Sequence, residues 1–181
     1  MPLKMHTAYF DSTPWHLRSF RSNAYNAQDG EPKAQGREFD TGVTSANGGL
    51  NGRFDDIEKF VNFLLGVGDQ DTAASVLSRE TLAEMMQPRV LAEDSEDVRV
   101  WWGLTFQIIE RKKGPAAGTV FIGHTGSQWW YLTSIFINPR AGTAGIVASN
   151  TDGGEKERAA FRAAQKIAFD MAAAPVAAGS N

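Results

Sequence analysis

Hydrophobic and polar positions alternate through the second half of the chain, which is the pattern of strands with one buried face. Between residues 100 and 110, Trp102, Leu104, Phe106 and Ile108 share one side, so we predict a first strand there. Further strands are predicted at 119–124, 131–138 and 143–150. The turns between them are short and contain glycine or proline, which favours an antiparallel meander.

Hydrophobic residues recur at helical spacing elsewhere. A first helix is predicted over 54–65, with Asp55 and Asp56 in its first turn and Gly66 at its end. Its expected buried stripe is Phe54, Ile57, Phe60, Val61, Leu64 and Leu65. A second short helix is predicted over 78–86, after an N-cap at Ser78.

A final helix is expected after a cap at Thr151 or Asp152. Its predicted stripe is Ala160, Ala164, Ile167, Ala168 and Met171. The small alanines of this stripe suit close packing against the face of a sheet.

The remaining segments lack a regular period. Residues 1–40 are predicted to form a long irregular loop, whose aromatic side chains need cover from a neighbouring surface. Residues 93–97 carry four acids and are interpreted as a solvated loop rather than a metal site. We therefore predict an α+β fold: an antiparallel sheet of about four strands, a C-terminal helix packed on it and a small helical region. Residues 1–175 form a single domain in this prediction, and 176–181 a frayed tail.

Composition narrows the function classes. The chain has 181 residues, 42% of them hydrophobic, and a net charge of −3, which suits a globular domain and not a nucleic-acid binder. Cysteine is absent, and the three histidines are scattered, so neither a disulfide framework nor a histidine-rich metal site is expected. No signal-like core or membrane-length apolar run is visible, so we expect no membrane segment, and no cofactor is predicted.

One motif combines groups that can bind a ligand: Gly123-His124-Thr125-Gly126-Ser127, which ends a predicted strand. The glycines allow the backbone to approach a ligand closely, while the histidine and the hydroxyls supply a titratable group and hydrogen-bond partners. On these residues alone, a polar turn between strands is the alternative interpretation.

The motif resembles the third active-site box of the penicillin-binding and serine β-lactamase superfamily, usually Lys-Thr-Gly, for which His-Thr-Gly is a known variant. Other segments follow in the order of the class C β-lactamase-related serine hydrolases. Residues 5–11 are similar to the segment after the second box, and 46–50 with the following helix are similar to the Gly-Gly-Leu helix. The Ser149-Asn150 strand end and the final helix complete the resemblance.

Two motifs that the resemblance requires are missing from these 181 residues. No serine is followed three positions later by lysine, so Ser-x-x-Lys, which carries the nucleophile, is absent. No tyrosine begins a Tyr-x-Asn second box. The chain therefore looks like the C-terminal portion of such a hydrolase, with an incomplete β-lactamase/transpeptidase-like fold, and we expect it to be inactive alone.

The resemblance implies a substrate-binding site made of His124, Thr125, Gly126 and Ser127, and no catalytic nucleophile or metal in this chain. The backbone N–H of Ser127 would be one donor of the oxyanion hole. The charge of His124 would depend on pH. The implied substrate is a small acyl compound, peptide or ester, and the implied protein partner is a missing N-terminal half or a second copy.

Three alternatives remain open at this point. The chain could be a non-catalytic binding module that keeps the groove, or a truncated product with no independent role. It could also be an unrelated α+β interaction domain in which Trp129, Trp130 and Tyr131 form a protein interface.

Overall fold

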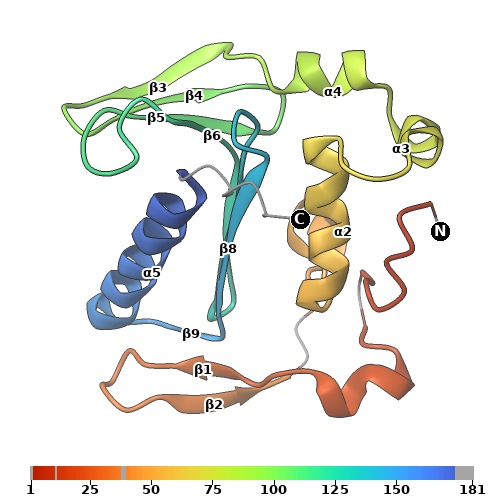
Figure 1. Ribbon diagram of the computed structural model, residues 1–181. Coiled ribbons are helices and arrows are strands. Elements are labelled where there is room, and N and C mark those ends of the chain that lie inside the picture. The colour runs from red at the N-terminus through yellow and green to blue at the C-terminus, as the bar shows by residue number, and fades with distance from the viewer. Residues whose placement is uncertain (1, 11, 38–39, 174–181) are drawn as a thin grey trace, which may run out of the picture.

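The computed structural model describes residues 2–10, 12–37 and 40–173 (Figure 1). A six-stranded antiparallel sheet has the order β3-β4-β5-β6-β7-β8. Its strands are β3 (Val90–Asp94), β4 (Val98–Trp102), β5 (Gln107–Arg111), β6 (Val120–Gln128), β7 (Tyr131–Asn138) and β8 (Thr143–Ser149). A smaller sheet of order β2-β1-β9 contains β1 (Ala24–Asn26), β2 (Lys33–Gly36) and β9 (Thr151–Asp152).

Helices cover both faces of the large sheet. The helical elements are η1 (Trp15–Phe20), η2 (Gly42–Thr44), α1 (Ser45–Gly48), α2 (Phe54–Leu65), α3 (Gln70–Val76), α4 (Arg79–Met85) and α5 (Glu155–Ala173). Figure 1 shows the sheet between α2 on one side and α5 on the other. The predicted α+β class and the C-terminal helix on an antiparallel sheet are therefore confirmed, although the sheet has six strands and not four.

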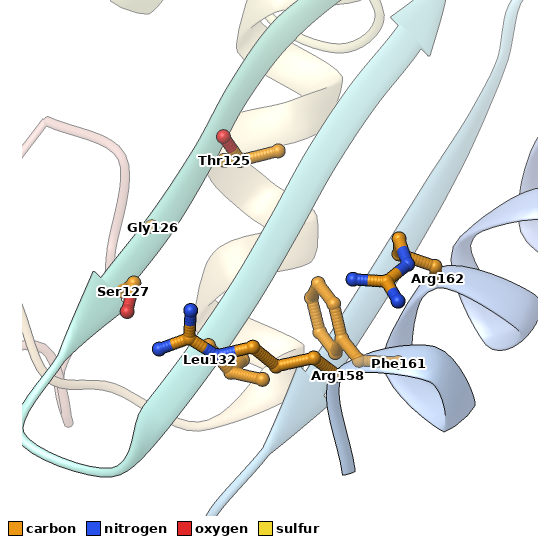
Figure 2. Close-up of a pocket in the computed structure, with 7 residues that line it drawn as sticks. All are labelled: Thr125, Gly126, Ser127, Leu132, Arg158, Phe161 and Arg162. Atoms are coloured by element: carbon orange, nitrogen blue, oxygen red, sulfur yellow. The ribbon is translucent and has the colours of Figure 1, made fainter. Parts of the chain in front are cut away.

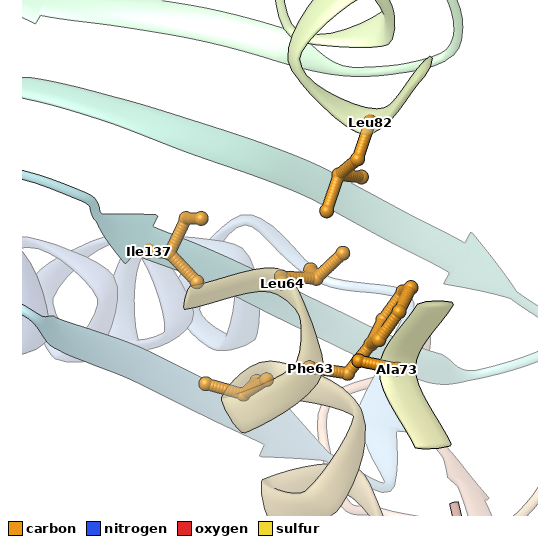
Figure 3. Packing of buried hydrophobic residues seen from close by; sticks show 6 residues of the cluster. Phe63, Leu64, Ala73, Leu82 and Ile137 are labelled. Atoms are coloured by element: carbon orange, nitrogen blue, oxygen red, sulfur yellow. The ribbon is translucent and has the colours of Figure 1, made fainter. Parts of the chain in front are cut away.

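Each face of the sheet has its own core. On the α2 face, Val61 and Leu64 pack with Leu82 of α4 and Ile137 of β7 (Figure 3). On the α5 face, the ring of Phe169 lies 4.6 Å from that of Phe121 and 5.1 Å from that of Phe136, centroid to centroid. Because neighbouring residues of a strand point to opposite faces, β6 contributes to both cores.

The helix predictions hold in part. Helix α2 ends at Gly66, which has the left-handed conformation expected of a helix-ending glycine, and Ser78 caps α4 through its side chain. Phe54, predicted to be buried, is exposed, and α3 was not predicted. The first turn of α2 contains a buried carboxylate at Asp56.

For α5 the predicted face was wrong. Ile167 and Met171 are 60% and 73% exposed, and Ala160 and Ala164 are exposed as well. The buried side instead contains Phe169 and Ala172, next to the half-buried Phe161, Gln165 and Ala168. Thr151 and Asp152 form β9 rather than a cap, because they pair with β1, and the helix begins at Glu155.

The strand predicted over 100–110 is two strands. The chain reverses at Gly103–Phe106, where Thr105 has a φ of 75° and the Gly103 N–H donates to the Phe106 carbonyl at 2.8 Å. Hydrophobic and polar residues alternate through this turn as they do in the strands, so the sequence pattern did not predict it. The acidic stretch is not a loop throughout: Glu93 and Asp94 belong to β3, which pairs with β4.

The N-terminal segment is more ordered than predicted. It contains η1 and the β1–β2 hairpin, and β1 pairs in parallel with β9. The predicted frayed tail at 176–181 lies outside the described residues. Among the residues described here, no helix is both long enough and apolar enough to cross a bilayer.

Candidate functional site

Strand β6 pairs with β5 over Val120–Gly123 and with β7 over Ile122–Gln128, so only Ile122 and Gly123 are paired on both sides. Its ladder with β5 ends at the pair Gln107 and Gly123, whereas its ladder with β7 continues to Gln128 and Tyr131. Within the described part of the chain, the segment His124–Gln128 therefore has one unpaired edge, and β6 ends four residues later than predicted. An open edge offers unpaired N–H and C=O groups to a ligand.

The register identifies which groups face this edge. Gln128 and Tyr131 flank a two-residue turn, so their N–H and C=O groups face each other. Backbone groups of an antiparallel strand alternate in direction, so those of Thr125 and Ser127 point away from β7 toward the open edge. The Ser127 N–H thus has the direction that an oxyanion donor needs.

The side chains of the motif divide between the two faces of the sheet. His124 is exposed on the α2 side, where its Nδ1 contacts the carbonyl oxygen of Thr125. Thr125 and Ser127 point to the α5 side. Histidine and hydroxyls therefore lie on either side of one edge and do not form a single cluster.

Close packing against β7 leaves no room for a side chain at Gly123 and little room at Gly126. A Cβ at Gly123 would lie 1.9 Å from the Ile135 carbonyl oxygen, and one at Gly126 would lie 2.5 Å from the Thr133 hydroxyl.

A cavity of about 230 Å³ adjoins the motif on the α5 face. Its lining residues are Thr125, Gly126, Ser127, Leu132, Arg158, Phe161 and Arg162 (Figure 2). Figure 2 shows the guanidinium of Arg158 extending from α5 toward the strand end that carries Ser127. Two hydroxyls and two guanidinium groups beside apolar side chains suit a ligand that has a carboxylate and an apolar body.

Acidic neighbours hold both arginines in place. Arg158 donates from Nε and Nη2 to the two oxygens of Asp152 at 2.9 and 3.0 Å, and this lowers the pKa of Asp152 from its usual value. This pair leaves the Nη1 of Arg158 unused by Asp152. Arg162 pairs with Glu155 in the first turn of α5.

The aromatic run after the motif forms the hairpin turn. Trp129 and Trp130 have φ values of 42° and 65°, the left-handed region that such a turn requires and that bulky residues seldom adopt. The Tyr131 hydroxyl donates to the Ser22 carbonyl at 2.8 Å. All three side chains are partly buried.

Of the four residues predicted to bind substrate, Thr125, Gly126 and Ser127 line this cavity and His124 does not. Arg158, Phe161 and Arg162 were missed, because they lie on a helix whose orientation was predicted incorrectly. The only available signal was the pair of arginines spaced four residues apart, which share a helix face. Among the described residues, no three His, Cys, Asp or Glu side chains converge as a metal site would require.

The chain matches a known protein family. The profile of the family described as Beta-lactamase matches residues 1–169. A comparison with curated protein sequences gave no match.

Several solved structures have the same fold. The chain is similar to the octameric penicillin-binding protein homologue from Pyrococcus abyssi, with a TM-score of 0.65 and 21% identity over 92% of this chain and 35% of that one. It is similar to a class C beta-lactamase, with a TM-score of 0.65 and 15% identity over 98% and 49%. A D-alanine carboxypeptidase from Burkholderia cenocepacia gives 0.61 and 16%, over 92% and 51%. The chain spans between about a third and half of the length of these proteins.

Proposed function

The chain belongs to the beta-lactamase family, and from that premise we propose that it forms the substrate groove of a serine hydrolase that transfers an acyl group from an amide or ester. The observation that carries this proposal is the open edge of β6 at His124–Gln128. The substrate lies along this edge, and the N–H of Ser127 donates to the oxygen that becomes negative during attack.

The cavity on the α5 face extends the proposal to a substrate with a carboxylate. Thr125 and Ser127 offer hydroxyl donors, and the Nη1 of Arg158, which Asp152 does not use, offers a charged one. Charge-assisted hydrogen bonds of this kind are stronger than neutral ones. The nucleophile comes from a Ser-x-x-Lys segment, which these 181 residues do not contain.

His124 contributes from the other side of the edge. An imidazole nitrogen accepts a hydrogen bond from the substrate when it lacks a proton and donates one when it carries a proton. His124 orients the substrate or relays a proton to the attacking serine, and it is not itself the nucleophile.

Binding by the isolated chain tests this proposal. A β-lactam that carries a free carboxylate should shift the amide resonances of Thr125 and Ser127 saturably, whereas its methyl ester should bind about tenfold more weakly. Arg158→Gln should remove this difference, and Lys156→Gln, a change outside the cavity on the same helix, should preserve it. The absence of saturable shifts at Thr125 and Ser127 with either ligand would refute the groove.

The chain should not hydrolyse chromogenic β-lactams or p-nitrophenyl esters above a buffer control, because an oxyanion donor without a nucleophile gives little catalysis. An acyl adduct on any serine of this chain, detected by mass spectrometry, would contradict the division of roles proposed here.

A non-catalytic binding module of the same fold is the second candidate, and the missing nucleophile favours it. The two candidates differ in what an added segment does. The test is to add the N-terminal half of a relative, which carries a Ser-x-x-Lys motif. Turnover of the substrate would then support the hydrolase. Unchanged binding without turnover would support the binding module.

A further inference from the structure

The short helix η1 exposes two aromatic side chains to solvent. Trp15 and Phe20 are 82% and 81% exposed, more than any other Trp, Phe or Tyr in the described part of the chain. The Trp15 ring lies edge-on to the exposed His16 ring, with 5.6 Å between the centroids. Figure 1 shows η1 as the orange-red coil at the lower edge of the molecule, just before β1. Large apolar side chains gathered on a surface in this way indicate a binding site.

The backbone that carries these side chains is held by contacts on its inner side. Thr13, two residues before η1, is 2% exposed, and its hydroxyl accepts a hydrogen bond from the Tyr9 hydroxyl at 3.1 Å. The Leu17 N–H donates to the Pro14 carbonyl at 2.9 Å, and the Nε of Arg18 donates to the Thr13 carbonyl at 3.4 Å. The exposed rings are therefore presented by a backbone fixed in place, which lowers the entropy cost of binding.

Positive charge accompanies the two rings. Residues 12–28 contain two arginines and neither aspartate nor glutamate, although the whole chain has a net charge of −3. Residues three apart in a 3-10 helix lie on one row, so Trp15 and Arg18 share a row of η1. Arg37, which follows β2, adds a guanidinium whose Nη1 donates to the Arg18 carbonyl at 3.2 Å. Among the described residues, neither Arg18 nor Arg37 pairs with a carboxylate, so both charges are available to an anionic partner.

We propose that η1 binds the surface of a lipid bilayer that carries anionic headgroups. We call Trp15, Phe20, Arg18 and Arg37 the η1 surface. The rings enter the headgroup region, where tryptophan is favoured, and the guanidinium groups pair with the anionic groups of the lipids. This inference is independent of the proposed function.

The area of the η1 surface favours a bilayer over a protein as its partner. Two aromatic side chains bury roughly 300–500 Å². A specific protein interface needs about 800 Å² from each partner. Attachment to a bilayer needs only a few inserted apolar side chains together with cations that attract anionic lipids.

Sedimentation with lipid vesicles tests the η1 surface. Wild-type protein should bind mixed vesicles of phosphatidylcholine and phosphatidylserine about tenfold more tightly than vesicles of phosphatidylcholine alone, and added salt should weaken this binding. Trp15→Ala should lower the affinity for mixed vesicles about tenfold, and Phe20→Ala should lower it as well, so the test does not depend on the folding of one variant. Met171→Ala, which truncates a 73% exposed side chain on α5, is the control and should leave the affinity unchanged.

The contribution of charge is measured separately. Arg18→Gln combined with Arg37→Gln should remove most of the preference for mixed vesicles, whereas Arg140→Gln, in the exposed turn between β7 and β8, should preserve it. Absence of wild-type binding to mixed vesicles, or equal binding of wild type and Trp15→Ala, would overturn the proposal. If vesicles are not bound and Trp15→Ala instead lowers association between chains in light scattering, the η1 surface is a protein interface and the lipid proposal is wrong.

Discussion

At the scale of single residues, Asp56 attaches the N-terminal segment to α2. Its carboxylate is 1% exposed and accepts hydrogen bonds from the N–H and the hydroxyl of Thr7 and from the ammonium of Lys59, each at 2.6 Å. Burial by itself raises the pKa of this carboxyl, but the hydrogen bonds outweigh burial and hold the pKa well below its usual value.

Asp56→Asn should lower the free energy of unfolding by about 2–4 kcal/mol, because an amide N–H₂ would face the Lys59 ammonium in a buried site. Urea denaturation measures this loss. Asp55→Asn, one position earlier and exposed, is the control and should cost less than about 1 kcal/mol.

The stabilisation that the Asp56 carboxylate provides depends on pH in a defined direction. A depressed pKa stabilises the folded state above the unfolded-state pKa of about 3.9 and stops doing so as pH falls toward the folded-state value. The difference in the free energy of unfolding between wild type and Asp56→Asn should therefore be constant from about pH 8 to 5 and shrink below about pH 4. A difference that already changes between pH 8 and 6 would mean that another group is responsible.

At the scale of elements, the sequence pattern predicted that helix α5 exists but not which of its faces is buried. Its existence followed from helical spacing, but alanine is too small to mark a buried face, and Phe161, Gln165 and Phe169 are in fact turned toward the sheet. The hairpin at Gly103 was missed for a related reason, since alternation on both sides of a turn looks continuous. The motif on β6 was found because its residue types carry chemistry, whereas the arginines of the cavity become significant only once α5 is placed over β7 and β8.

Paired substitutions on α5 test the observed face. Phe169→Ala should lower the free energy of unfolding by about 3–5 kcal/mol, because it empties the space between Phe121 and Phe136. Ile167→Ala, two positions earlier and exposed, should change it by no more than about 0.5 kcal/mol. Thermal melts of both variants suffice, and an equal loss in the two would show that Ile167 is covered in solution.

At the scale of the whole molecule, the large sheet ends in an open edge at β8. Beside it lies a groove of about 320 Å³ between this strand and α5, with Val147, Ala148, Ala160 and Ala164 in its lining. Unpaired edges next to apolar surface promote association between chains.

Isolated chains should associate as concentration rises, which size-exclusion chromatography with light scattering measures, and should bind an apolar dye. Ala148→Lys, a charge on the exposed edge of β8, should reduce association. Ala117→Lys adds the same charge in the β5–β6 loop and should have little effect. A compact monomer at every concentration, with a cooperative melt and no dye bound, would show that the edge needs no cover.

The parallel pairing of β1 with β9 has a consequence for biosynthesis. The side chain of Asn150 donates to the carbonyl of Asn23, 127 residues earlier, and the Tyr25 N–H donates to the Asn150 carbonyl. A ribosome that adds about 5–20 residues per second needs roughly 6–25 s to cover this separation. During that interval the nascent N-terminal segment has no β9 to pair with, and the N–H of Tyr25 lacks its acceptor on Asn150. The β2-β1-β9 sheet therefore forms only after Thr151 and Asp152 have been synthesised.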